Sequence, residues 1–194
     1  MSPTVSILVT LRAILDQLSG ADSPGSPESP ESPGSPGADC QLWPPPCRVV
    51  LSPGLDIAWD ACGASPCSDE RDGQLWANIT TMTMTADGAG TCERVTWTAD
   101  VGIVRCAATL QDDGSAPTVA AVEYDAWQQA TDADIIRYAI RCCPDRPEQV
   151  GDLQLVSWTA LGPSGGCVGG AWTISGVLED CCGSVPTFVR PPGC

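Results

Sequence analysis

The chain has 194 residues, a formal net charge of −15 and twelve cysteines, and it contains no histidine. All nine of its basic residues are arginine. This composition excludes Ser-His-Asp and Cys-His catalysis, imidazole metal ligands, lysine Schiff bases and the lysine of a Walker-type phosphate loop. The negative charge also argues against a surface built to bind nucleic acid, although an acidic wall would keep a passing phosphate backbone from adhering.

The first twenty residues predict an amphipathic helix. Apolar residues recur there at steps of three and four positions, at Ile7, Leu8, Leu11, Ile14, Leu15 and Leu18. That spacing is typical of a helix face packed on a core, and a partner-binding helix is the alternative. The segment lacks a basic start, so we expect no export signal. No stretch reaches the roughly 20 apolar residues that span a bilayer, so we expect no membrane contact.

Residues 21–39 repeat Ser-Pro-Gly and Ser-Pro-Glu units. Proline blocks helix and sheet hydrogen bonds, and the segment has almost nothing apolar to bury. We therefore expect a flexible tether, with a motif for a proline-binding partner as the alternative. The chain divides into an N-terminal helix (1–20), the tether (21–39) and a cysteine-rich body (40–194).

The body begins with strands. Residues 47–51 and 55–60 predict two short ones. A long hairpin is predicted from residues 75–85 and 94–107, joined by the turn 86–90, because both runs alternate and the turn is rich in glycine. Gly102 is predicted to mark a bulge or bend in the second strand.

Residues 117–143 are helical by composition, either as two helices or as one kinked helix. Thr131 resembles a helix start, since its hydroxyl could accept backbone N–H bonds. A final hairpin is predicted from 153–161 and 171–178, around a glycine-rich loop at 162–170. The fold class is therefore α+β, with an antiparallel sheet flanked by helices.

The cysteines favour disulfides, because such a density is typical of secreted proteins and virion surfaces. The candidates are Cys40, Cys47, Cys62, Cys67, Cys92, Cys106, Cys142, Cys143, Cys167, Cys181, Cys182 and Cys194. Short-loop pairs such as Cys40 with Cys47 and Cys62 with Cys67 are geometrically open, but spacing does not define the connectivity. Structural zinc and buried thiols are the alternatives. A chain made in a cytoplasm and oxidised after release would combine many cysteines with no export signal.

Other chemistry has weaker support. Arginine precedes Cys106 and Cys142, but adjacent strand residues point to opposite faces, which argues against thiol activation at Cys106. Acidic pairs could act in glycoside hydrolysis, and residues 68–73 could hold calcium, yet acidic residues are ordinary in turns. The pairs are Asp56/Asp60, Asp69/Glu70/Asp72, Asp112/Asp113 and Glu179/Asp180. We therefore assign no catalytic residue, metal or cofactor.

The candidate interface residues combine exposed tryptophan with the glycine-rich loop. A loop at the tip of a rigid hairpin can reach a neighbouring subunit, and tryptophan is favoured at interfaces. Trp43, beside three prolines, is the tryptophan that we expect to be partly exposed. We expect Trp97, Trp158 and Trp172 to pack in the core unless they lie at an interface. The candidates are Trp43, Gly165, Gly166, Val168, Gly169 and Trp172.

Three stretches together resemble a known family. They are WTADVGIVRC at 97–106, DADII at 132–136 and GGCVGGAWTI at 165–174. In their order they resemble head-to-tail connector proteins of tailed phages that infect actinobacteria, most of all the tail terminators. The resemblance covers residues 1–18 and 40–182, and the long tether departs from the compact family pattern.

The resemblance implies a structural virion protein without catalytic residues. It implies a homo-oligomeric ring, a hexamer, which joins the tail tube protein to head-side connector proteins and lets DNA pass through its lumen without specific binding. Such a protein is assembled in the host cytoplasm and resides in the phage neck or tail. Another neck component such as a stopper, an exported disulfide-rich binding domain, and a metal- or carboxylate-dependent hydrolase are the alternatives.

Overall fold

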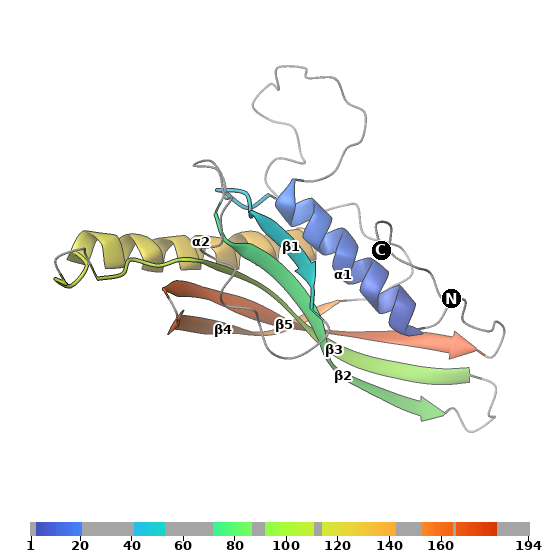
Figure 1. The fold of residues 1–194 in the computed structure, drawn as a ribbon. Coiled ribbons are helices and arrows are strands. Elements are labelled where there is room, and N and C mark those ends of the chain that lie inside the picture. The colour runs from blue at the N-terminus through green and yellow to red at the C-terminus, as the bar shows by residue number, and fades with distance from the viewer. Residues whose placement is uncertain are drawn as a thin grey trace, which may run out of the picture.

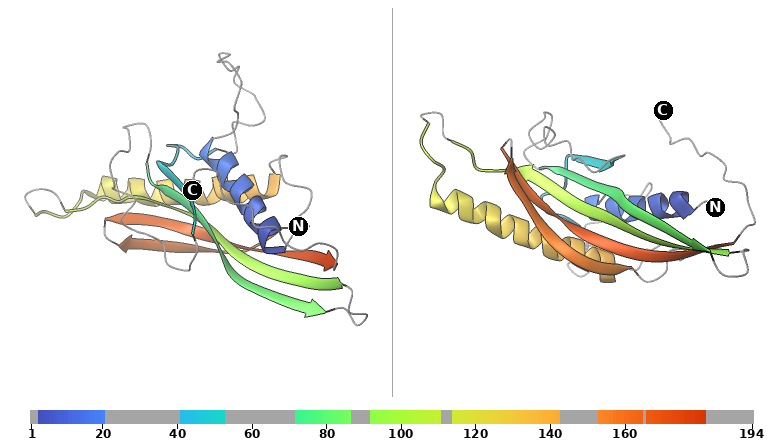
Figure 2. Two further views of the ribbon diagram at one scale, coloured as in Figure 1. Left: turned by 45° about the vertical axis from the view of Figure 1, so that its right-hand side comes forward. Right: turned by 90° about the horizontal axis from the view of Figure 1, so that it is seen from below.

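A computed structural model describes residues 3–20, 41–52, 72–86, 92–110, 114–142, 153–164 and 166–181. Its elements are α1 (Pro3–Ser19), β1 (Arg48–Leu51), β2 (Gln74–Ala86), β3 (Cys92–Cys106), α2 (Val119–Cys142), β4 (Gln154–Ser164) and β5 (Cys167–Cys181). The strands form one sheet in the order β1-β2-β3-β5-β4, and both helices lie on the same side of it (Figures 1 and 2).

The predicted α+β class is confirmed, with one difference in the sheet. β1 runs parallel to β2, whereas the other neighbouring strands are antiparallel, so the sheet is mixed. The predicted tether at 21–39, the predicted strand at 55–60 and the turn residues 87–90 lie outside the described residues.

Helix α1 packs its apolar stripe on the sheet, as its spacing predicts. Ile7, Leu11, Leu15 and Leu18 are completely buried in the core. The helix ends at Ser19, and Gly20 follows with a φ of 67°, in the left-handed region that glycine adopts without strain.

The central hairpin is confirmed as β2 and β3, which pair from Gln74↔Val104 to Ala86↔Glu93. The predicted bulge at Gly102 is wrong, because the register shift lies between Ile79 and Thr81. Gly102 instead permits close packing. A Cβ atom there would lie 2.6 Å from the Gly170 carbonyl oxygen and 2.7 Å from the Trp76 ring.

The final hairpin is also present, but the predicted loop at 162–170 is wrong for most of its length. β4 continues to Ser164 and β5 begins at Cys167. The glycines of this stretch serve strand packing, because a Cβ atom at Gly170 would collide with the Trp158 ring.

Helix α2 is a single helix of 24 residues. The Thr118 hydroxyl accepts a hydrogen bond from the Ala121 N–H at 3.2 Å and so caps the N-terminus. The predicted helix start at Thr131 is wrong, because its hydroxyl donates to the Trp127 carbonyl oxygen one turn earlier, at 2.9 Å. Neither described helix combines the length and apolar character needed to cross a membrane.

The core lies between the helices and the facing side of the sheet. Trp97 is fully buried in this core. Trp158 and Trp172 pack against the core, and the centroids of these two rings lie 5.8 Å apart. Gly176 stands directly opposite Trp97 on β5, where a Cβ atom would lie 2.6 Å from the indole ring. The indole therefore occupies space that only glycine leaves open.

Replacing Gly176 with alanine should overpack this core. Because a buried indole has little room to move, we expect Gly176→Ala to lower the free energy of unfolding by about 1–3 kcal/mol. Denaturant titration followed by tryptophan fluorescence measures the loss. Ser175→Ala on the other face of the same strand is the control, with an expected change within about 0.5 kcal/mol. Equal stability of the glycine variant and the wild type would contradict the packing argument.

Candidate functional site: helix α2 and the network that anchors it

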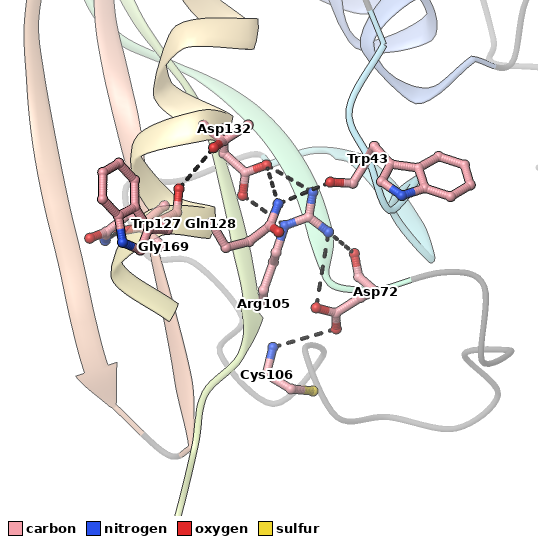
Figure 3. A network of polar contacts seen from close by, with 10 residues as sticks. Trp43, Asp72, Arg105, Cys106, Trp127, Gln128, Asp132 and Gly169 are labelled. Carbon is pink, nitrogen blue, oxygen red and sulfur yellow. Dashed lines mark hydrogen bonds and ion pairs between the residues drawn. The ribbon is translucent and has the colours of Figure 1, made fainter. Parts of the chain in front are cut away.

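A buried ion pair joins α2 to the sheet. Arg105 near the end of β3 donates from Nε to Asp132 Oδ2 at 2.7 Å and from Nη2 to Asp132 Oδ1 at 2.9 Å (Figure 3). The two residues are only 3% and 1% exposed. Such a two-bond contact matches the planar guanidinium to the carboxylate and defines the position of α2 over the strand.

The third nitrogen of the Arg105 guanidinium group also has a hydrogen-bond partner. Arg105 Nη1 donates to the backbone carbonyl oxygen of Asp72 at 2.8 Å. Gly73 follows with a φ of 85°, and a Cβ atom there would lie 2.9 Å from Arg105 Cγ. The turn before β2 therefore needs glycine for its backbone conformation and for the close approach of the arginine.

Two titratable groups beside this arginine have shifted pKa values. Burial raises the pKa of Asp132, while the hydrogen bonds and charge of Arg105 act in the opposite direction. Burial also raises the pKa of the Cys106 thiol, and the nearby Asp72 carboxylate raises it further. A nucleophilic cysteine needs a lowered pKa, so this environment disfavours thiolate chemistry at Cys106.

The N-terminal half of α2 is held by polar contacts. Gln128 Nε2 donates to the Trp43 carbonyl oxygen at 2.9 Å and to Asp132 Oδ1 at 3.3 Å. One turn earlier, Asp125 Oδ2 accepts from the Ala108 N–H at 2.8 Å. These contacts attach the helix to the segment before β1 and to the segment after β3.

Strand β5 contributes two further polar contacts. Gln129 Nε2 donates to the Gly169 carbonyl oxygen, and Trp172 Nε1 donates to the Ala133 carbonyl oxygen at 2.8 Å. The indole of Trp172 therefore packs against the core with its ring and hydrogen-bonds the helix with its nitrogen. Together these contacts give α2 one position on the sheet.

Beside the network lies a small, partly open cavity of about 30 Å³, lined in part by Arg105, Gln128 and Asp132. This volume has room for about one or two water molecules. Pockets for small-molecule ligands are commonly about 300–1,000 Å³. The cavity fits a hydrated structural network and not a substrate site.

The opposite face of α2 carries exposed aromatic side chains. Trp127 is 75% exposed and Tyr138 is 43% exposed on this face. Tyr124 is 63% exposed at the margin of the face, where it also lines the cavity beside Gln128. The N-terminal turns of α2 extend beyond the ends of β4 and β5 (Figure 1).

The predicted interface residues do not form a common tip. Trp43 is 74% exposed, as expected, but Trp172 is half-buried and Gly169 is buried against α2. Gly166 forms the β4–β5 turn with a φ of 79°, Val168 is half-buried in β5, and Gly165 lies outside the described residues. Sequence reasoning missed Trp127 and Tyr124, because only the tertiary structure shows which side of α2 Asp132 turns toward the sheet.

Of the cysteines, Cys47, Cys92 and Cys167 are disulfide-bonded, and Cys142 carries an exposed thiol. The described residues contain no group of three acidic or cysteine side chains that could hold a metal ion. Of the acidic candidates, Asp72 belongs to the network, and Glu179 is exposed on β5. Candidates whose side chains lie outside the described residues are Cys40, Cys62, Cys67, Cys143, Cys181, Cys182, Cys194, Asp56, Asp60, Asp69, Glu70, Asp112, Asp113 and Asp180.

In comparisons with known proteins, no family model and no curated protein matches this chain.

Removing one member of the ion pair should leave the other charge buried without compensation. We expect Asp132→Asn to lower the free energy of unfolding by about 3–5 kcal/mol. The double replacement Arg105→Met with Asp132→Leu should recover most of that loss, because it removes both charges and keeps the volume. Denaturant titration of both variants measures the difference, and a harmless Asp132→Asn would show that the pair does not hold α2.

The pKa of Cys106 predicts its reactivity. Asp72→Asn removes the nearby negative charge that raises this pKa, so a larger fraction of Cys106 should be thiolate at a given alkaline pH. We expect faster alkylation of Cys106 by iodoacetamide and a midpoint of the rate–pH profile at lower pH than in the wild type. Peptide mass spectrometry measures the rate, with Cys142 in the same sample as the control. An unchanged Cys106 profile would contradict the assigned role of Asp72.

Proposed function

We propose that this protein is a structural subunit of a tailed-phage virion. In this proposal it is a tail terminator, or a closely related neck component, that assembles into a ring at the head–tail junction. Its partners are further copies of itself, the tail tube protein and head-side connector proteins. The proposal assigns it no catalytic step and no cofactor.

One observation carries the proposal: a rigidly anchored helix presents large aromatic side chains to solvent. Trp127 and Tyr124 project from the helical turns that the Arg105–Asp132 pair and Gln128 hold in place. Tryptophan and tyrosine are enriched at protein interfaces, because a rigid ring contributes much contact area at a low entropic cost. A structural subunit that is covered by its neighbours in the particle accounts for this exposure.

On the sheet face opposite the helices, Gln74, Trp76 and Asn78 are buried, and the part of this face around Thr81 and Thr98 supports the passage of DNA. Thr81 and Thr98 lie there with their hydroxyl oxygens 2.6 Å apart, and the Thr173 hydroxyl donates to Asp100 at 2.7 Å. Of the described residues of β2 to β5, only Arg94 places a basic side chain on this face. Because affinity for DNA depends on basic residues, this hydroxyl-rich face would let a duplex slide past. In this proposal the hydroxyl-rich face lines the path of the DNA, in place of the acidic wall that the composition favours.

The disulfide-bonded cysteines fit two locations. Cys47, Cys92 and Cys167 require an oxidising environment, which a released virion and an exported binding domain both meet. The location of the protein therefore separates the phage proposal from the exported binding domain.

Virions that carry an epitope-tagged copy of the chain should bind antibody at the junction of head and tail. We expect Trp127→Asp to reduce incorporation into particles at least tenfold, because a charge in the centre of an interface disrupts it, while Trp127→Phe keeps most of it. Negative-stain imaging and immunoblotting of purified particles measure both. As the control for folding, the isolated Trp127→Asp variant should be soluble and as stable as the wild type. A label away from the junction, or no label on particles, would reject the proposed function.

A further inference from the structure

We propose that neighbouring copies join through their sheet edges, with β4 of one copy paired to the outer part of β2 in the next. The ring would then contain one continuous sheet. This inference rests on the proposed ring and names the contact that closes it. The partner is a second copy of this chain.

Both edges of the sheet are exposed. β1 covers only Gln74–Ala77 of β2, and no described strand lies beyond residues 81–86 on that side. Met84, in this outer part, is 52% exposed. β4 forms the other edge, where Val156 is 59% exposed. Each edge therefore offers several residues of backbone that no described strand pairs with.

Neither edge carries a charged residue. The outer part of β2 has the sequence TMTMTA at 81–86, and β4 has the sequence QLVSWTALGPS at 154–164. This absence is notable in a chain with a net charge of −15. Proteins normally protect edge strands with charged side chains or proline, and here a single proline lies at the far end of β4. The two edges therefore lack the features that prevent pairing.

The strand directions suit a cyclic assembly. β2, β3, β5 and β4 alternate in direction across the sheet, so β4 runs opposite to β2. A rotation about an axis along the strands keeps the orientation of each copy. The β4 strand of one copy therefore meets the β2 strand of the next as an antiparallel partner. Such a contact joins two different surfaces, so it continues from copy to copy until the ring closes.

The backbone groups of β2 can be assigned by alternation. The Ala77 carbonyl oxygen accepts a bond from the Ser52 N–H at 2.8 Å, so the backbone groups of Ala77 face away from β3. The register shift between Ile79 and Thr81 moves this alternation by one residue. The N–H and C=O groups of Met82 and Met84 therefore face the free edge.

The same alternation assigns β4. Val101 pairs with Ala77 on one side, so its backbone groups face β5 and its partner there, Trp172. The next residue of β5, Ala171, therefore faces β4 and pairs with Thr159. Ala160 follows with its N–H and C=O groups directed outward.

The register requires a staggered ring. Gln154 lies level with Thr81 across the sheet, through Ser175 and Thr98. The outer part of β2 continues past this level, so the next copy must be displaced along the strands to place its β4 beside it. Closed sheets have such a stagger, because their strands tilt by roughly 35–45° from the barrel axis.

Proline substitutions test each edge separately. Met84→Pro and Ala160→Pro each remove one outward N–H group and leave the hydrogen bonds inside the subunit in place. We expect both variants to be monomers by mass photometry under conditions where the wild type forms a ring. Met84→Thr and Ala160→Thr are the matched controls, and they should assemble like the wild type because they keep the N–H group.

Mixing the two proline variants tests which edges meet. Met84→Pro keeps its β4 edge and Ala160→Pro keeps its β2 edge, so the equimolar mixture should form dimers although each variant alone does not. Dimers of one variant alone would show an edge pairing with itself and would overturn the inference. Rings that survive either proline, or a wild type that stays monomeric at every accessible concentration, would also overturn it.

Hydrogen exchange covers the case in which a proline variant fails to fold. In the wild-type ring the amides of Met84 and Ala160 should be protected, and fast exchange at either would contradict edge pairing. The outcomes also separate the two proposals. Rings that resist both prolines but lie at the head–tail junction reject only the edge contact, whereas proline-sensitive rings located elsewhere reject only the phage function.

Discussion

The contact between Arg105 and Asp132 is the constraint on which the rest of the arrangement depends. It joins the end of β3 to the middle of α2 inside the protein, with the guanidinium also bonded to the carbonyl oxygen of Asp72. A pair of buried charges is often no more stabilising than apolar residues of the same volume, but it tolerates only one relative placement of its elements. The apolar contacts of α2 lie in its C-terminal half, at Ile136, Ala139 and Ile140. The polar pair therefore determines where the N-terminal half lies, and with it the direction in which Trp127 and Tyr124 project.

Much of the fold could be predicted from the sequence, because its elements have a strong periodicity. The leucine and isoleucine spacing of α1 and the alternation of β2 and β3 each have a single simple interpretation, and both are confirmed. The wrong predictions concern residue types that can play two structural roles. Thr131 can cap a helix or bond back to the preceding turn, and here it does the latter. Glycine can form a loop or admit a neighbouring ring, and Gly170 and Gly102 do the latter.

The candidate site was less accessible to sequence reasoning. Arg105 and Asp132 are 27 positions apart, and only the tertiary structure shows that β3 and α2 bring them together. The glycine-rich stretch attracted attention as an interface, yet Gly169 and Trp172 serve the attachment of α2. The exposure of Trp127 follows from the side of α2 that Asp132 occupies, so it could be inferred only once that side was known.

The uncharged strand edges have a consequence for the life of the unassembled subunit. A strand of alternating threonine and methionine, without charge or proline, is a template for pairing with an extended chain, including a misfolded copy of itself. Correct closure and disordered aggregation would then compete for the same hydrogen bonds. Because aggregation grows with the concentration of free chains, a cell that produces this protein would need slow synthesis or an early partner that occupies one edge.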